Sequence, residues 1–527
     1  MVSSEDESIH LDEVLKKFGG FSRYHIQAIF LISFAFFNNG MHCINYVIVA
    51  EETPYRCRIE QCESQIREFD STYNFTTPHN SRGCYRYSSD SEECNPSSFN
   101  TSIVELCDEW IYKKEDSFVA EFNLACQDWK RTFVGTIHSI GLMCGLFFQG
   151  QLSDRIGRKA AIIIPGLAAA IFGIAKSYAT TYLTYITLEW FEATLGDNCS
   201  PAFILGVELV HSDHRLHQQI FFCVMAALGG VLFSLAAYLV PYWRHFVQLI
   251  YAPSLLFILY YFIMDESVRW LLSKGKKEKA TKLLLKMAKL NKITLDEKLL
   301  VNIRCEDNST KNCALWATFS SKIVIKRFLI CLIWWTSCTF ISFGLVVNVG
   351  SLAGNKYLNF GIMSLSDIPA SIAMVFILKR FKRKKPLLIS FILAGLLCLV
   401  HPMIPKEYVW TSTGVYFLGR FVSTFTFATV YIYTSELFPT YSRNSMHALC
   451  SAIGRIGSIL APMTPLLTQY MESLPTLLFG SISIAAGLTT LLVPDLANEP
   501  LPDNVKEAEN IGSFPLTSLS QKRDSKE

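Results

Sequence analysis

Long apolar runs separated by polar stretches dominate the chain. Most of them reach the length of about 20 residues that a helix needs to cross a bilayer. The runs form two groups of six, and they are Ile26–Ala50, Thr132–Gln151, Ala160–Tyr178, Tyr182–Val210, Gln218–Val240, Phe246–Met264, Phe328–Val349, Leu358–Leu378, Pro386–His401, Val409–Thr434, Met446–Thr468 and Thr476–Val493. The pattern predicts an all-α membrane protein with twelve transmembrane helices in two six-helix bundles.

Composition agrees with this pattern. Of the 527 residues, 50% are hydrophobic and only 18% are charged, whereas a soluble domain has roughly 25% charged residues. The formal net charge of +3 is too small to indicate a nucleic-acid-binding protein. We therefore expect a protein of the lipid bilayer that is not an enzyme and has no nucleic-acid partner.

Motifs for cofactors are absent from the sequence. There is no phosphate-binding Gly-x4-Gly-Lys-Ser/Thr loop, so an ATP-driven pump is not expected. His211, His214 and His217 lie in a short loop without further ligands at metal-binding spacing, so no metal site is predicted. We expect no cofactor, and Na⁺ or H⁺ as the coupling ion if one is used.

Basic residues mark one side of the membrane. Lys and Arg cluster before the first run and after the second, sixth and eighth, and the positive-inside rule places such segments in the cytoplasm. The expected location is the plasma membrane. The predicted organisation is a cytoplasmic N-terminus 1–25, an N-terminal bundle 26–264 with an extracellular loop 51–130, a cytoplasmic basic loop 265–327, a C-terminal bundle 328–493 and a cytoplasmic tail 494–527.

The stretch 51–130 carries features of an oxidising compartment. It holds six cysteines, an even number that favours disulfides, and six cysteines allow 15 pairings. The cysteines are Cys57, Cys62, Cys84, Cys94, Cys107 and Cys126. Two sequons, at Asn74 and Asn100, predict glycosylation of this loop.

The two halves of the chain repeat each other. The loop 154–159 after the second run corresponds to 379–384 after the eighth, and the stretch 208–215 corresponds to 436–443 at an offset of 228 residues. Each of the two longer stretches begins with Glu and ends with Arg. A parallel repeat of six spans is a transporter architecture, in which the substrate site lies near the midplane between the halves.

Charged residues at the inner ends of the spans are candidates for a gate. An acid and a base there can pair across the two halves when the inner side is shut, and they separate when it opens, which gives the bistable element that a switching protein needs. The predicted gating residues are Asp154, Arg158, Glu208, Arg215, Glu436 and Arg443.

Several stretches resemble known families. Residues 150–159 are similar to the loop signature of the major facilitator superfamily. Residues 265–272 and 433–443 resemble stretches of the organic-ion transporters, solute carrier family 22. The resemblance covers almost the whole chain, and it implies the major facilitator fold and transport of small organic cations, anions or zwitterions.

Ionisable residues inside spans are costly and usually functional. Arg455 in the eleventh run is a candidate contact for a substrate carboxylate, which a guanidinium binds bidentately, with a structural ion pair to Asp367 or Glu436 as the alternative. Glu189, Glu192 and Asp197 in the fourth run are candidates for attracting an ammonium group or a coupling cation, with pairing to Lys176 or His42 as the structural alternative.

Two further features complete the predicted substrate site. Asp367 lies beside Pro369, which frees backbone carbonyls in a transmembrane helix. Arg420 in the tenth run is equally consistent with a structural and a functional role. Phe343 and Tyr431 are the aromatic candidates, since an ammonium group over an aromatic face gains roughly 0.5–2 kcal/mol.

Acid and base together in one cavity suit a zwitterion. The predicted function is therefore a secondary active or facilitative transporter of small organic cations and zwitterions that works by alternating access. An organic-anion exchanger is the alternative that Arg455 favours and the acids of the fourth run disfavour. A non-transporting receptor on the same fold is the alternative from another class. The sequence leaves the oligomeric state open.

Overall fold

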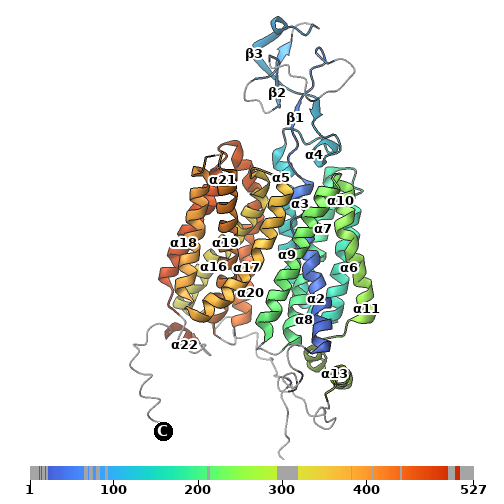
Figure 1. Ribbon diagram of the computed structural model, residues 1–527, viewed down its shortest axis with the longest axis vertical. Coiled ribbons are helices and arrows are strands. Elements are labelled where there is room, and N and C mark those ends of the chain that lie inside the picture. Colours follow the sequence, from blue (N-terminus) through green and yellow to red (C-terminus); the bar gives the residue numbers. More distant parts are fainter. Residues whose placement is uncertain are drawn as a thin grey trace, which may run out of the picture.

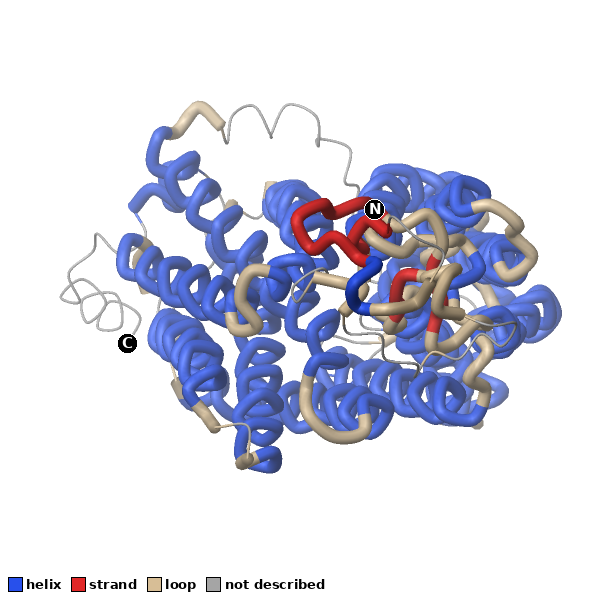
Figure 2. The backbone as a smooth tube through the Cα atoms, turned by 90° about the horizontal axis from the view of Figure 1, so that it is seen from above, coloured by secondary structure: helices blue, strands red, loops and turns tan. Residues whose placement is uncertain are grey.

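The computed structural model describes residues 22–63, 69, 75–78, 83–89, 93–210, 214–293, 319–381, 383–405, 407–439, 442–495 and 505–510, together with Leu11, Val14 and Phe18. Two bundles of helices stand side by side, and a small strand-containing segment lies beyond one end of them (Figure 1). Seen from above, this segment covers part of the helical layer (Figure 2). We call that end of the helices the loop end.

The N-terminal bundle contains six passes between the loop end and the opposite end. Its helices are α2 (Arg23–His42), α3 (Asn45–Val49), α5 (Asp128–Ile156), α6 (Arg158–Lys176), α7 (Tyr182–Leu195), α8 (Cys199–Leu209), α9 (Arg215–Leu239), α10 (Trp243–Tyr251), the 3-10 segment η3 (Ala252–Leu259) and α11 (Tyr260–Ile263). The short helices α12 (Val268–Ser273) and α13 (Lys277–Asn291) follow at the opposite end.

The C-terminal bundle repeats this plan. Its elements are α16 (Lys322–Val347), η4 (Asn348–Ser351), α17 (Lys356–Arg380), α18 (Lys384–Val400), η5 (His401–Met403), α19 (Val409–Leu437), α20 (Arg443–Leu460), η6 (Ala461–Gln469), α21 (Leu474–Thr489), η7 (Thr490–Leu492) and, beyond the last pass, α22 (Val505–Asn510). Side-chain caps start two of these helices, since Ser321 accepts from the Val324 N–H and Asn355 from the Leu358 N–H.

Within the described residues, eleven helices are long and apolar enough to cross a membrane. The prediction of an all-α membrane protein is confirmed. One predicted span, Tyr182–Val210, is wrong as a single helix, because the chain makes this fourth pass with the two shorter helices α7 and α8.

The break between α7 and α8 has a local cause. The Gly196 N–H ends α7 by donating to the Glu192 carbonyl over 2.8 Å. The Asp197 carboxylate then accepts hydrogen bonds from the Cys199 N–H over 2.9 Å and from the Ser200 hydroxyl over 2.7 Å, which starts α8. An aspartate that caps a helix start competes with continuation of the preceding helix.

The loop segment has its own small core. The strands β1 (Tyr55–Cys57) and β4 (Trp110–Tyr112) form one antiparallel pair, and β2 (Tyr85–Ser89) and β3 (Phe99–Leu106) form another. The 3-10 turn η1 (Pro96–Ser98) precedes β3, and the short helix α4 (Phe118–Glu121) leads back to α5. All six cysteines of this segment pair, as Cys57–Cys107, Cys62–Cys94 and Cys84–Cys126.

Packing differs between the two ends of the bundles. At the loop end one continuous hydrophobic cluster contains residues of both bundles, among them Tyr46 and Val134 from one and Leu345 and Phe479 from the other. At the opposite end the hydrophobic clusters are separate, each built from one bundle. The bundles are therefore joined by apolar packing at the loop end.

Two helices of the N-terminal bundle pack at backbone distance. A Cβ atom on Gly40 of α2 would collide with the carbonyl oxygen of Ala226 in α9, and one on Gly229 of α9 would collide with that of Phe37 in α2. Glycines let transmembrane helices approach this closely. The contact fixes α2 against α9 along one wall of the region between the bundles.

Candidate functional site

A cavity of about 430 Å³ lies between the two bundles. Its walls come from α2, α5, α9 and the α7–α8 break on one side, and from α16, α17, α19 and α20 on the other. Four of the six predicted substrate-binding residues line it, namely Asp197, Phe343, Asp367 and Arg455. Residues that are more than 250 positions apart in the sequence thus share one chamber.

Arg455 provides a positive group in this cavity. It is half-buried on α20, and among the described residues no carboxylate lies within ion-pair distance of its guanidinium. The two alternatives expected from the sequence, Asp367 and Glu436, are both paired with other arginines. A guanidinium without a fixed counter-charge can bind a carboxylate that enters the cavity.

Asp197 supplies a negative group to the opposite wall. Its carboxylate accepts hydrogen bonds from the Cys199 and Ser200 N–H groups and from the Ser200 hydroxyl at the start of α8. Its position at the helix break places it beside Cys199 and Ser200, which also line the cavity. The cavity therefore carries an acid on the N-terminal bundle and a base on the C-terminal bundle.

Asp367 is held by a second arginine. Arg420 donates from Nη2 to its Oδ2 over 2.9 Å, and Thr424 donates to its Oδ1 over 2.7 Å. Arg420 also donates to the Ser342 carbonyl over 3.0 Å. Both charged residues line the cavity, so Arg420 belongs to the site. The sequence marked Arg420 as an ionisable residue in a span, but the pattern could not show that Asp367 faces it.

The other two predicted substrate-binding residues lie elsewhere. Glu192 is 3% exposed and sits inside the N-terminal bundle, where its carboxylate faces Lys176 Nζ at 3.4 Å. Glu189 is paired with the same lysine at 2.6 Å. Tyr431 is 42% exposed, and its ring contacts that of His447 with centroids 4.2 Å apart. Neither Glu192 nor Tyr431 is among the residues that line the cavity.

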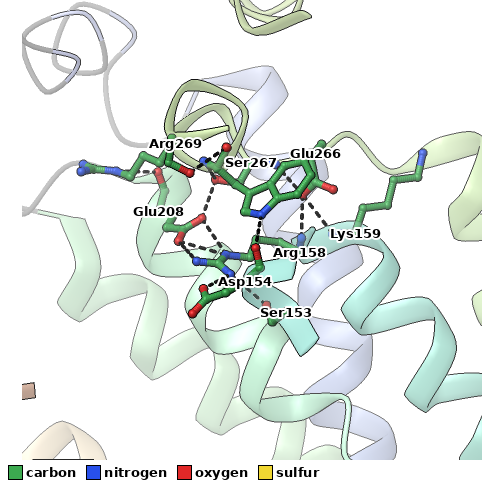
Figure 3. A network of polar contacts seen from close by, with 10 residues as sticks. Ser153, Asp154, Arg158, Lys159, Glu208, Glu266, Ser267 and Arg269 are labelled. Carbon is green, nitrogen blue, oxygen red and sulfur yellow. Dashed lines mark hydrogen bonds and ion pairs between the residues drawn. The ribbon is translucent and has the colours of Figure 1, made fainter. Parts of the chain in front are cut away.

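Several predicted gating residues form a polar network at the opposite end of the N-terminal bundle (Figure 3). Arg158 forms ion pairs with Asp154 at 2.7 Å and with Glu208 at 2.9 Å. The Ser267 hydroxyl donates to Glu208 over 2.5 Å. Glu266 accepts from the Arg158 N–H over 2.8 Å at the start of α6. These contacts tie the ends of α5, α6, α8 and α12 together.

The C-terminal bundle repeats the central pair of this network. Arg383, which follows α17, binds the Glu436 carboxylate with Nε and Nη2 over distances of 3.1–3.2 Å. The two pairs, Arg158–Glu208 and Arg383–Glu436, occupy corresponding positions of the sequence repeat. Each of these two pairs lies inside its own bundle, so the described gating residues pair within the halves and not across them as expected.

Some predicted residues fall on the undescribed part of the chain. The side chains of Arg215 and Arg443 and the sequon at Asn74 lie outside the described residues. Asn100, the other sequon, is exposed on β3. Of the loop histidines, His211 is outside the described residues, and the rings of His214 and His217 are 6.4 Å apart.

Polar contacts between the bundles are found toward the loop end. Glu51 forms an ion pair with Lys356 at the start of α17. On α5, Thr136 donates to the Ile459 carbonyl over 3.1 Å. Gln469 donates to Asp128 over 2.8 Å. Together with the shared hydrophobic cluster, these contacts close the loop end over the cavity.

Comparison with known proteins identifies the family to which this chain belongs. The model of the family described as "Sugar (and other) transporter" matches residues 68–502, which is most of the chain. The chain belongs to this transporter family. Its members are transporters and not enzymes, and the two-bundle arrangement with a cavity between the halves is the major facilitator fold.

Relatives of this transporter agree with the resemblance seen in the sequence. An "Organic cation transporter protein" of Drosophila melanogaster is 28% identical, with 96% of this chain and 95% of the relative covered. "Solute carrier family 22 member 3" of Mus musculus is 28% identical, with 97% and 98% covered. The similarity to solute carrier family 22 is confirmed.

Solved structures show the same fold at low sequence identity. The inward open conformation of the xylose transporter XylE from E. coli aligns with a TM-score of 0.60 at 14% identity, covering 92% of this chain and 99% of that one. The partially occluded inward open form of the same protein aligns with a TM-score of 0.59 at 15% identity, covering 90% and 100%.

Proposed function

We propose that this transporter moves small organic cations and zwitterions across the plasma membrane by alternating access. The observation that carries the proposal is the cavity between the bundles, in which Arg455 has no carboxylate partner among the residues that the structure describes and shares the chamber with Asp197. The names of two relatives from Drosophila melanogaster, "Organic cation transporter protein" and "Organic cation transporter-like protein", support the same substrate class.

Each residue of the cavity has a proposed role. Arg455 binds the carboxylate of a zwitterion, and Asp197 attracts its ammonium group. Phe343 offers an aromatic face to the same cation. Asp367 is neutralised by Arg420, so it contributes to shape and local polarity rather than to net charge. The remaining charges, one base at Arg455 and one acid at Asp197, suit a zwitterion better than a purely anionic substrate, so an organic-anion exchanger is disfavoured.

The orientation of the chain follows from its loop segment. Three disulfides and the exposed sequon at Asn100 fit an extracellular loop end, and both termini are then cytoplasmic. With that orientation the structure is closed outside, as in an inward-facing state of the transport cycle. We propose no cofactor and either H⁺ or Na⁺ as a coupling ion.

Uptake measurements test this function. Cells that express the transporter are offered a labelled tetraalkylammonium ion, a labelled betaine and a labelled dicarboxylate in parallel, with and without Na⁺ and at two external pH values. We expect uptake of the betaine and the cation above that of mock-transfected cells. Uptake of the dicarboxylate alone would instead support an anion exchanger, and binding without flux would support a receptor.

The Glu51–Lys356 pair is expected to hold the loop end closed. In Glu51→Gln the pair is lost, and since exposed pairs contribute about 0.2–1 kcal/mol, the outward-open population should rise up to about fivefold. The native cysteines Cys43 and Cys223 line the cavity, so the rise is measured as faster labelling by a membrane-impermeant maleimide. The charge-swapped double variant Glu51→Lys/Lys356→Glu should return the rate to normal, and an unchanged rate in Glu51→Gln contradicts the role.

Arg158 is expected to set the rate of the conformational change. In Arg158→Ala, the Glu208 carboxylate keeps its contact with the Ser267 hydroxyl but loses its arginine partner. Loss of these charge-assisted bonds should slow initial uptake about tenfold while the protein still reaches the cell surface. Arg155→Ala is the matched control, because Arg155 lies exposed in the same segment. Near-normal initial uptake in Arg158→Ala would count against a gating role.

A further inference from the structure

A buried ionisable network lies inside the N-terminal bundle, next to the cavity but not part of its lining. Three helices contribute its charged members: α5 provides His138, α6 provides Lys176, and α7 provides both Glu189 and Glu192. None of these four residues is more than 3% exposed. α10 contributes Tyr251, which is fully buried. Burying ionisable side chains inside membrane spans costs free energy, and such residues usually have a function.

The distances define how the charges are shared. Lys176 Nζ lies 2.6 Å from Glu189 Oε2 and 3.4 Å from Glu192 Oε2. His138 Nδ1 lies 2.8 Å from Glu189 Oε1 and 3.6 Å from Glu192 Oε2. The Tyr251 hydroxyl accepts from Lys176 over 3.1 Å. Two carboxylates thus face one ammonium group and one imidazole.

The remaining polar groups around the network are neutral. On α2, His42 donates from Nε2 to the Ile250 carbonyl over 3.0 Å and stacks on Tyr251, and on α3, Asn45 donates to Glu189 over 3.3 Å. The Tyr46 ring lies 5.5 Å from the His138 ring. On α7, Tyr185 is fully buried one turn before Glu189. None of these groups supplies a second fixed positive charge.

Charge balance then requires one more positive charge. With His138 neutral, the network holds two carboxylates and one ammonium group, a net charge of −1 in a part of the bundle without access to water. An uncompensated buried charge costs several kcal/mol. With its proton on Nδ1 facing Glu189, His138 presents a bare Nε2, and this atom is buried without a hydrogen-bond partner among the described residues. One proton on His138 Nε2 or on Glu192 makes the network neutral.

The network is mechanically close to the substrate cavity. The Glu192 carbonyl accepts the Gly196 N–H that ends α7, and the next residue, Asp197, lines the cavity. On α5, Leu142 lines the cavity one turn after His138. On α2, Cys43 lines it directly after His42. A change of charge at Glu192 therefore acts on the helix break that carries Asp197.

We propose that the Lys176–Glu189–Glu192–His138 network is the proton-coupling site of this transporter, holding one exchangeable proton shared between Glu192 and His138. This inference rests on the proposed transport function and specifies its coupling ion. Release of the proton leaves the buried network with an uncompensated net charge of −1, which disfavours the water-excluding packing of α7 against α5 and α6 and shifts the α7–α8 break. Binding and release of substrate at Asp197 are thereby linked to the proton.

A metal ion or Na⁺ is the rival occupant. His138, Glu189 and Glu192 bring one possible ligand atom each within 4.8 Å of one another. Lys176 already places its ammonium group at two of these three side chains, so a further cation would meet a like charge at close range. A proton adds the missing charge without that repulsion.

Glu192→Gln is the decisive variant. It leaves Lys176 and Glu189 as a neutral pair, so the network folds without an extra proton. The assay uses proteoliposomes with the membrane potential clamped and an inward proton gradient of one pH unit. If one proton is carried with each substrate, the unmodified transporter should accumulate labelled betaine about tenfold. In Glu192→Gln the accumulation ratio should fall to one, while exchange of labelled for unlabelled betaine without a gradient continues.

A second readout separates the proton site from transport. The pH-induced infrared difference spectrum of the lipid-reconstituted protein should contain a carboxyl or imidazolium band that Glu192→Gln removes. Glu121→Gln is the matched control. Glu121 is ion-paired with Arg244, but it lies outside the network and is partly exposed, so this variant should change neither readout.

Accumulation driven by Na⁺ instead of the pH gradient, or a band that persists in Glu192→Gln, overturns the proposal. If the unmodified protein gives the band but transports no betaine, the proton site stands and the proposed transport function is wrong.

Discussion

Replacing Arg455 with alanine is expected to raise the betaine concentration that gives half-maximal uptake about 10- to 100-fold. The change removes the cavity guanidinium that has no counter-charge among the described residues, and hydrogen bonds to charged groups contribute about 1.5–3 kcal/mol each. The measurement is the concentration dependence of initial uptake in cells with matched surface expression.

The control for Arg455 is a substrate without a carboxylate. Uptake of a tetraalkylammonium ion should change little in Arg455→Ala, because its contacts are with Asp197 and Phe343. Arg455→Lys keeps the charge but not the planar pair of donors, and it should restore betaine uptake only in part. Equal losses for both substrates would make Arg455 a structural residue.

Lys176→Met is expected to destabilise the protein by about 3–5 kcal/mol, the cost of leaving buried partners without their counter-charge. The lysine is fully buried and faces both Glu189 and Glu192. The effect is measured as a lower midpoint of thermal unfolding of the purified, lipid-reconstituted protein and as poor delivery to the cell surface.

A double variant checks the cause of that loss. Lys176→Met/Glu189→Gln removes one positive and one negative charge together, so most of the stability should return. If the double variant is no more stable than Lys176→Met, the lysine acts through packing of its side chain over the Tyr251 ring, whose centroid lies 4.5 Å from Nζ, and not through charge balance.

Much of the fold was predictable from sequence because span length and hydropathy are set by the bilayer itself. The one wrong helix, Tyr182–Val210, shows the limit of that signal. The predicted run passes through Gly196, Asp197 and Asn198, a polar triplet of turn and cap residues that is compatible with a helix break. The break itself depends on hydrogen bonds from the backbone to the Asp197 side chain, and hydropathy averaged over a whole run does not register such a short-range signal.

The site was predictable in part for a similar reason. Ionisable residues inside spans stand out in the sequence, and this found Arg455, Asp197 and Asp367. Whether a residue faces the cavity or the inside of its bundle depends on the rotation of its helix about its own axis, which packing determines. The sequence therefore predicts Glu192 in the cavity, whereas its carboxylate faces Lys176. His138 carried the same signal, since it is an ionisable residue in an apolar run, but nothing in the sequence connected it with α7.

The backbone contact between α2 and α9 also bears on which positions of the chain tolerate substitution. At Gly40 and Gly229 even one added methyl group must push two main chains apart. By contrast, Phe30 and Leu235 are largely exposed on the outside of the bundle, where lipid can fill the space of a shortened side chain. Gly40 and Gly229, which have no side chain at all, are therefore among the positions at which this chain is least free to vary.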